Sequence, residues 1–219
     1  NSGSANTALG FESLQTNKGG NRSVAIGYKS MFYANNNSSS FITYNTAIGY
    51  EALKGSSTAA NNTGTKNTAI GYQSMQNNTS GRDNTATGYN ALLANTTGLS
   101  NTGYGAFSLK ANTTGNQSVA IGFNSLYTNT TGSSNTAIGS NALYTNSIGN
   151  ENTAVGIETL LSNTTGSGNS ATGYQALFSN TTGEENTAVG FKSIRANTTG
   201  EANTGIGLNT LITNTTGSN

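Results

Sequence analysis

The sequence predicts an all-β fold, a parallel β-solenoid or β-roll of twelve 17-residue coils. Three observations lead to this fold class. The segment Asn-Thr-Ala-Ile-Gly at residues 135–139 recurs at a fixed spacing, glycine recurs twice in each repeat, and no window between the glycines suits a helix. A fixed short period is typical of a solenoid, in which each repeat forms one coil and packs only against its neighbours.

The repeats form a single array over residues 1–219. They begin at Asn6, Ser23, Asn45, Asn67, Asn84, Asn101, Ser118, Asn135, Asn152, Asn169, Asn186 and Asn203. We number the positions of each repeat from 1 to 17, starting at these residues. The second and third repeats span 22 residues instead of 17. Their insertions, near residues 34–44 and 56–63, are predicted to form loops on one face of the solenoid.

The chain starts at Asn1 in the middle of a repeat and ends at Asn219, at position 17. Neither end carries a capping sequence, and solenoids normally cap their terminal coils to block pairing of the exposed edge. We therefore expect this chain to be a segment of a longer fibre, or a unit that stacks end to end.

Glycine at position 5 of every repeat predicts a turn, with positive φ or a close approach of two backbones. These turn glycines are Gly10, Gly27, Gly49, Gly71, Gly88, Gly105, Gly122, Gly139, Gly156, Gly173, Gly190 and Gly207. If the residues inserted in the second and third repeats are left out of the count, position 15 is glycine in all repeats except the second. Two glycine corners in each repeat predict a flattened coil with two short strands.

Apolar and charged residues occupy different positions of the repeat. Position 3 is alanine or glycine, position 9 is leucine, methionine or isoleucine, and position 4 is mostly isoleucine or valine. Charged residues occur only at positions 7, 10, 13, 16 and 17. Because charges are rarely buried without a partner, these five positions are predicted to face solvent. The Asn-Thr-Ala-Ile-Gly segment and position 9 are predicted to be enclosed.

So thin a coil is predicted to need partners. Burial of its few apolar side chains, at about 25 cal/mol per Å², barely offsets an ordering cost of roughly 1–2 kcal/mol per residue. We therefore expect several chains to assemble as an intertwined or side-by-side homotrimeric fibre, with the Asn-Thr-Ala-Ile-Gly faces buried between subunits.

The composition argues against an enzyme and against a resident cofactor or metal. The chain has no cysteine and no histidine, and only eight acidic residues. The commonest metal ligands and acid–base groups are therefore missing. A net charge of +1 gives no electrostatic reason to expect nucleic acid as a partner, and no apolar run is long enough for membrane insertion.

Two segments, Ser-Val-Ala-Ile-Gly at residues 23–27 and again at 118–122, carry a resemblance to a known family. They resemble the repeats in the YadA-like heads of trimeric autotransporter adhesins. The Asn-Thr-Ala-Ile-Gly form is also similar to repeat arrays in phage tail fibres and bacterial surface proteins. The YadA-like family implies a left-handed parallel β-roll with three chains per fibre, exposed at a cell surface and used for adhesion. Its repeat is shorter than 17 residues and lacks the Asn-Thr-Thr-Gly segment found in this chain.

Aromatic residues recur at position 6 and form a candidate ladder. They are Phe11, Tyr28, Tyr50, Tyr72, Tyr89, Phe123, Tyr174 and Phe191. The ladder suggests either a sugar-binding stripe or rings that pack on one another and on a neighbouring subunit. Interruptions at Ala106, Ser140, Ile157 and Leu208 favour packing.

Asparagines at position 12 give candidate N-glycosylation sites of the Asn-Thr-Thr form. They are Asn95, Asn112, Asn129, Asn163, Asn180, Asn197 and Asn214. The structural alternative, which we favour, is that each asparagine bonds to its own turn and stacks in a ladder of amides. The threonines at positions 13 and 14 also suggest ice binding, but adjacent residues of a strand point to opposite faces, which disfavours a flat threonine array.

The sequence therefore predicts a non-enzymatic structural or adhesive fibre segment, from a surface adhesin, a phage tail fibre or an extracellular filament. Its expected location is extracellular, at a cell surface or on a virion. Its expected partners are copies of itself, as a homotrimer or an end-to-end polymer, and a cell-surface glycan or protein receptor. The alternative is a repeated-face binding module for glycan or ice.

Overall fold

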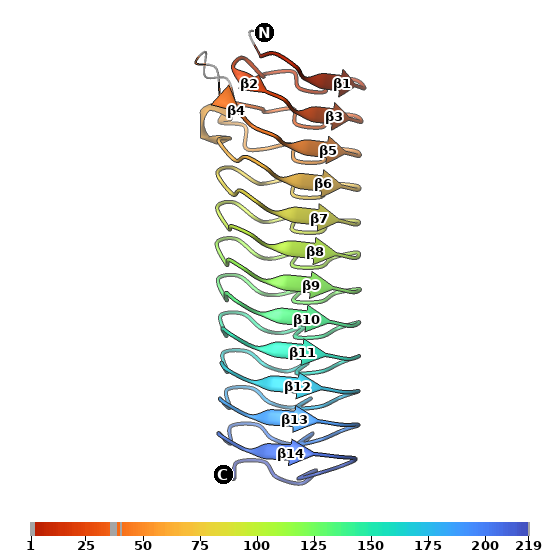
Figure 1. Cartoon of the computed structure of the whole chain (residues 1–219), viewed down its shortest axis with the longest axis vertical. Coiled ribbons are helices and arrows are strands. Elements are labelled where there is room, and N and C mark those ends of the chain that lie inside the picture. The colour runs from red at the N-terminus through yellow and green to blue at the C-terminus, as the bar shows by residue number, and fades with distance from the viewer. Residues whose placement is uncertain (1–2, 36–38, 40, 219) are drawn as a thin grey trace. The chain divides into compact units, whose positions relative to one another are not determined.

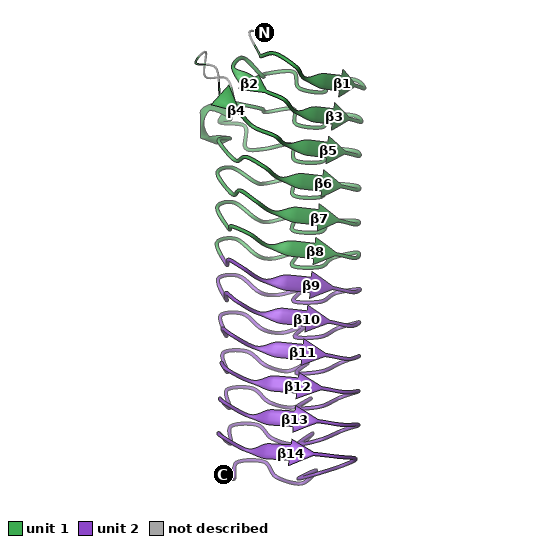
Figure 2. Cartoon of the chain, viewed as in Figure 1, with its two compact units in different colours: residues 1–114 green, residues 115–219 purple. Residues whose placement is uncertain are grey.

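The computed structural model describes residues 3–35, 39 and 41–218. Two compact units make up the chain, Asn1–Thr114 (unit 1) and Gly115–Asn219 (unit 2), as Figure 2 shows. Part of the first predicted insertion, at residues 36–38 and 40, lies outside the described residues, and so do residues 1, 2 and 219 at the predicted uncapped ends.

Each repeat contributes one strand of three residues, at positions 2–4 (Figure 1). In unit 1 the strands are β1 (Thr7–Leu9), β3 (Val24–Ile26), β5 (Thr46–Ile48), β6 (Thr68–Ile70), β7 (Thr85–Thr87) and β8 (Thr102–Tyr104). In unit 2 they are β9 (Val119–Ile121), β10 (Thr136–Ile138), β11 (Thr153–Val155), β12 (Ser170–Thr172), β13 (Thr187–Val189) and β14 (Thr204–Ile206). Unit 1 also contains the short strands β2 (Gly20–Asn21) and β4 (Phe41–Ile42) and the 3-10 helix η1 (Ala59–Asn61).

Within each unit, every strand pairs in parallel with the strand of the next repeat. The register is one full repeat, so that Ala137 of β10 lies opposite Ala154 of β11 and Ala120 of β9. The strand order follows the sequence, from β1 to β8 without β2 and β4 in unit 1 and from β9 to β14 in unit 2. This confirms the predicted all-β fold, a parallel β-solenoid of about twelve 17-residue coils. In the described part of the chain, no helix has the length and apolarity to cross a membrane.

The prediction of two short strands in each coil was wrong. After position 5 the chain runs through consecutive turns instead of a second strand. Positions 7 and 9 have left-handed φ in every coil, for example 56° at Glu158 and 51° at Leu160. Strands require strongly negative φ, so a residue of this kind at every second position keeps the segment from becoming extended.

The strand alternates between the interior and the outer surface, which corrects part of the burial prediction. Position 3 points inward and is fully buried, as at Ala137, because successive strand residues face opposite sides. Position 4 therefore points outward, and Ile138 is 38% exposed. In the single chain the Asn-Thr-Ala-Ile-Gly segment is thus enclosed only at its asparagine and alanine, whereas its threonine and isoleucine lie on the outer face of the sheet.

The apolar core of each coil is correspondingly small. In the repeat that begins at Asn135, only Ala137, Ala142 and Leu143 are buried apolar side chains. Leucine, methionine or isoleucine at position 9 supplies most of the apolar volume, as predicted. The remaining interior is polar, because the asparagines at positions 1 and 12 are buried as well.

The two recurrent glycines serve different geometric needs. At position 5, Gly139 has a φ of +134°, and an added Cβ would lie 2.4 Å from the carbonyl oxygen of Gly156 in the next coil. At position 15, a Cβ on Gly166 would lie 2.4 Å from the carbonyl oxygen of Gly183 and 2.6 Å from Oδ1 of Asn163. Position 5 therefore needs glycine for its φ and for space, and position 15 needs it for space.

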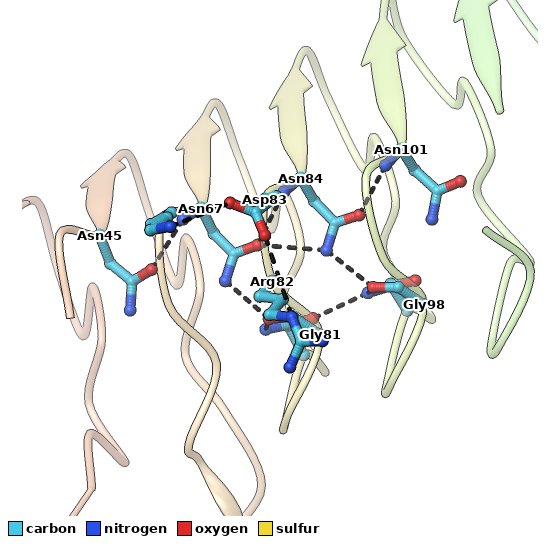
Figure 3. A network of polar contacts seen from close by, with 11 residues as sticks. Asn45, Asn67, Gly81, Arg82, Asp83, Asn84, Gly98 and Asn101 are labelled. Atoms are coloured by element: carbon cyan, nitrogen blue, oxygen red, sulfur yellow. Dashed lines mark hydrogen bonds and ion pairs between the residues drawn. The ribbon is translucent and has the colours of Figure 1, made fainter. Parts of the chain in front are cut away.

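Two ladders of buried asparagines run through the coils. At position 1, Nδ2 of Asn84 donates to Oδ1 of Asn67 (3.1 Å) and to the carbonyl oxygen of Gly98 (2.8 Å), as Figure 3 shows. At position 12, Nδ2 of Asn163 donates to Oδ1 of Asn146 (2.8 Å) and to the carbonyl oxygen of Gly166 (2.9 Å). The bonds satisfy polar groups that would otherwise be buried without partners.

The insertions interrupt the position-12 ladder. Ala34 and Ser56 stand where asparagine is expected in the second and third coils. Asn62, which belongs to the second insertion, partly replaces it. Its Oδ1 accepts from the backbone N–H of Ser56 (3.0 Å), and its Nδ2 donates to the carbonyl oxygens of Ser56 (2.9 Å) and Tyr33. A cavity of about 30 Å³, lined by Asn17, Asn62 and other residues of these coils, remains at the break.

We expect Asn163→Ala to lower the free energy of unfolding by at least about 2 kcal/mol. The change leaves Oδ1 of Asn146 and Nδ2 of Asn180 buried without their ladder partner, and each such loss costs about 1–3 kcal/mol. Thermal unfolding followed by circular dichroism measures the effect. The matched control is Thr165→Ala, an exposed site two residues away, which is expected to change stability by less than about 0.5 kcal/mol. Equal shifts for both variants would show that the ladder does not stabilise the fold.

Candidate binding surfaces

The described residues offer no constellation for metal-dependent chemistry. No group of three or more histidine, cysteine, aspartate or glutamate side chains among them could hold a metal ion. Two surfaces of the coil are candidates for binding, one formed by positions 2, 4 and 6 and the other by positions 7 and 10.

The first surface, which we call the apolar stripe, consists of the outward side chains at positions 4 and 6. Most of the exposed large apolar residues in the described part of the chain belong to it. At position 4 they are Leu9, Ile70, Tyr104, Ile121, Ile138, Val189 and Ile206. At position 6 they are Phe11, Tyr28, Tyr50, Tyr72, Tyr89, Phe123, Ile157, Tyr174, Phe191 and Leu208. No charged residue occurs at positions 2, 4 or 6 in any repeat, so the stripe is apolar in both units.

The aromatic residues of the stripe stack from coil to coil, as the sequence suggested. In unit 1 the ring centroids of Tyr50 and Tyr72 are 5.0 Å apart with planes 7° from parallel, and those of Tyr72 and Tyr89 are 5.1 Å apart. In unit 2 Tyr174 stacks on Phe191 at 5.3 Å. The rings pack against one another and still remain exposed, with 41% of Tyr72 accessible. Stacking alone therefore leaves much of this apolar surface uncovered.

The surface formed by positions 7 and 10 carries charged and amide side chains together with aromatic and aliphatic ones. In unit 1 these groups satisfy one another around Glu51. Its carboxylate accepts from Nζ of Lys54 (2.7 Å), Nε2 of Gln73 (2.9 Å) and Nε2 of Gln76 (2.5 Å). Burial acts to raise the pKa of Glu51, but the hydrogen bonds from Lys54, Gln73 and Gln76 outweigh it, and the pKa lies below its usual value.

Cations at positions 7 and 10 lie over neighbouring aromatic rings. Nζ of Lys29 is 5.1 Å from the ring centroid of Tyr28, and Nζ of Lys192 is 5.0 Å from that of Phe191. A hydrogen bond with Tyr28 raises the pKa of Lys29, although burial opposes it. These contacts place charges along one border of the apolar stripe and not within it.

The structure buries six of the seven candidate glycosylation sites. Asn95, Asn112, Asn129, Asn163, Asn180 and Asn197 are 0% exposed. They form the position-12 ladder, so a glycan on any of them would displace a bonded amide from the interior. Asn214, in the last coil, is partly exposed and bonds to its own turn through Gly217. The position-12 asparagines thus bond to their own turns and stack in a ladder of amides, which is the arrangement that we favoured over glycosylation.

The threonines at position 13 also take part in the coil-to-coil bonding. The hydroxyl of Thr164 donates to the carbonyl oxygen of Thr181 (3.0 Å), and that of Thr181 donates to the carbonyl oxygen of Thr198 (2.9 Å). Their hydroxyls are therefore directed along the chain of coils. The side chains that do project at alternate positions from a flat strand are those at positions 2 and 4, which the sequence analysis had placed in the interior.

Comparisons with known proteins add no assignment. No protein-family model, curated protein or solved structure matches this chain.

We expect Glu51→Gln to reduce the acid sensitivity of the protein. Because the folded state lowers the pKa of Glu51, its carboxylate stabilises the fold above the ordinary carboxyl pKa of about 4.3. That contribution disappears as the pH falls through the lower pKa of the folded state. Between about pH 5 and pH 2 the variant should therefore lose less stability than the parent protein, measured as Tm by circular dichroism.

Glu184→Gln serves as the control, because its exposed side chain has no hydrogen bond or ion pair in the described part of the chain. It should leave the pH dependence of Tm nearly unchanged. If Glu51→Gln and the parent protein lose stability in parallel, the contacts around Glu51 do not depress its pKa.

Proposed function

We propose that this chain is a non-enzymatic segment of a structural or adhesive fibre, and that copies of it assemble through the apolar stripe. The observation that carries the proposal is the stripe itself, which repeats in nearly every coil and contains no charge. Soluble monomers rarely expose continuous apolar patches larger than a few hundred Å², and larger ones usually mark interaction sites.

The composition of the stripe and its borders supports an interface. Aromatic and branched apolar side chains occupy its centre, and charged residues stand beside it at position 7, for example Glu12, Lys29 and Lys192. An apolar, charge-depleted centre with a polar rim is the usual arrangement of a protein–protein interface. The thin core gives a second reason, because each coil buries few apolar side chains by itself.

A homotrimer outside the cell, at a cell surface or on a virion, is the assembly that we propose. The resemblance of residues 23–27 and 118–122 to YadA-like head repeats supports three chains rather than two. In this assembly the stripes of three chains meet and bury positions 4 and 6. The chain then acts mechanically, by holding a receptor-binding part away from the surface to which the fibre is attached.

We expect the purified chain to have the mass of three chains by light scattering across a dilution series. A variant with Ile121→Thr, Phe123→Ser, Ile138→Thr, Val189→Thr and Phe191→Ser, which changes the stripe in unit 2 only, should dissociate to monomers at a higher protein concentration than the parent protein does. It should still fold, because the chain itself has Thr87 and Thr172 at position 4 and Ser140 at position 6. Its loss of apolar contact area weakens the attraction between stripes.

The matched control changes apolar residues on the other surface of the coil. The control variant carries Leu93→Gln and Phe178→Gln, both at position 10. Two other repeats already have glutamine at this position, Gln15 and Gln76. This control should retain the mass of the parent protein. A monomeric parent protein at all concentrations would overturn the proposed assembly, and the exposed stripe would then favour the repeated-face module for glycan or ice.

A further inference from the structure

Unit 2 has a shallow open hollow on the surface formed by positions 7 and 10. It is lined by Asn124 and Asn141 at position 7 and by Tyr144 and Leu161 at position 10. Its volume is about 270 Å³. None of these four residues belongs to the apolar stripe.

Tyr144 gives the hollow a rigid aromatic wall. Its ring stacks on that of Tyr127 with a centroid distance of 5.1 Å and planes 14° from parallel, so one face is covered and the ring is held in place. On the other side the next coil has Leu161, whose side chain is shorter than a tyrosine ring. Tyr144 is partly exposed and lines the hollow, so the part of its ring that Tyr127 does not cover is accessible there.

The side-chain amides of Asn124 and Asn141 supply hydrogen-bonding groups in a fixed relative orientation. Nδ2 of Asn124 donates to Oδ1 of Asn141 at 3.2 Å, which sets the relative orientation of the two amides. This bond leaves Oδ1 of Asn124 as an acceptor and Nδ2 of Asn141 as a donor. Both residues have a φ of 56°, a left-handed conformation that asparagine tolerates better than most residues. Glu158 continues the same row in the next coil and accepts from Gln175 at 2.7 Å.

Around Glu51 in unit 1, the polar side chains at positions 7 and 10 are engaged with one another. There Lys54, Gln73 and Gln76 direct their donors onto one carboxylate. The same repeat positions are thus used differently at the two places. Around Glu51 three donors bond to one carboxylate, whereas Asn124 and Asn141 form an amide pair that lines a hollow together with Tyr144.

We propose that the hollow at Asn124, Asn141, Tyr144 and Leu161 binds a neutral saccharide. A pyranose ring has an apolar face of C–H groups, which fits the exposed face of Tyr144, and a rim of hydroxyls that both donate and accept hydrogen bonds. Asn141 can donate to such a hydroxyl and Asn124 can accept from one. The volume is slightly below the range of about 300–1,000 Å³ that is usual for small-molecule pockets, so the hollow suits a ligand as small as one sugar ring.

The local charge favours a neutral sugar over an acidic one. The four lining residues are uncharged, and the nearest charge in the row is the carboxylate of Glu158. A sialic or uronic acid would meet repulsion from this carboxylate with no cation in the lining to compensate.

The site rests on the adhesive role in the proposed function and names the class of ligand for that role. It does not require the chain to self-associate. All its residues belong to unit 2 and lie at positions 7 and 10, whereas the apolar stripe uses positions 4 and 6. The hollow can therefore remain open when the stripe is covered.

Saturation-transfer NMR on the full chain tests the proposal with three probes: the methyl glycosides of β-glucose and β-galactose, and chitotriose. We expect transfer to the ring protons of at least one probe. Tyr144→Leu, which keeps an apolar residue as at Leu93 and Leu161, should weaken binding about tenfold, equivalent to roughly 1.4 kcal/mol. Asn141→Ala should weaken it in the same direction, and Gln76→Ala, on unit 1, should leave it unchanged.

Circular dichroism confirms that each variant folds, so that a loss of binding can be assigned to the site. No transfer to any probe at millimolar sugar overturns the proposal, and so does binding that Tyr144→Leu and Asn141→Ala leave unchanged. Light scattering on the same samples separates the two proposals. Sugar binding by a monomeric chain would support the proposed site and overturn the proposed assembly. An oligomer that binds no probe would support the assembly and overturn the site.

Discussion

In most of the regular coils, a pair of side-chain hydrogen bonds to one glycine carbonyl closes the coil. The carbonyl oxygen of Gly166, at position 15, accepts from Asn152 at 2.8 Å and from Asn163 at 2.9 Å, across the interior of the coil. Both amides also bond to the coil before, so the same groups link neighbouring coils. With polar side chains filling the centre, little room is left for apolar ones. The small core, the outward isoleucines and the need for glycine at position 15 all follow from this arrangement.

The repeat made most of the fold predictable from the sequence. Its fixed period determined the parallel register, and glycine at positions 5 and 15 indicated corners that only glycine can form. The direction of the strand side chains was harder to predict. Absence of charge suggested that the whole segment was enclosed, yet Ile138 faces outward because Ala137 must face inward. The left-handed φ at leucines such as Leu160 could not be predicted either, since leucine does not favour this conformation.

The candidate surfaces were predictable in part, for a related reason. The aromatic ladder at position 6 could be predicted from the sequence, because its members occupy the same position in successive repeats and therefore stack. A hollow between positions 7 and 10 depends on two rows of side chains and on size differences between successive coils, such as Tyr144 beside Leu161. The consensus of the repeat does not contain these differences between coils, so it could not predict the hollow. The aromatic residues that the sequence analysis associated with sugar lie in the stripe, whereas the proposed sugar site uses an aromatic residue at position 10.

The asparagine ladders also constrain how a chain of this kind can change over generations. Most coils offer their neighbours the same bonding groups, so a duplication or deletion of whole 17-residue repeats keeps the ladders in register. The five-residue insertion before Asn67 leaves its bond to Asn45 at position 1 intact but breaks the position-12 ladder, which Asn62 partly repairs beside Ser56. Unequal exchange between similar stretches of the gene can therefore lengthen or shorten the protein in whole coils. The number of coils can change in this way without altering the cross-section of any coil.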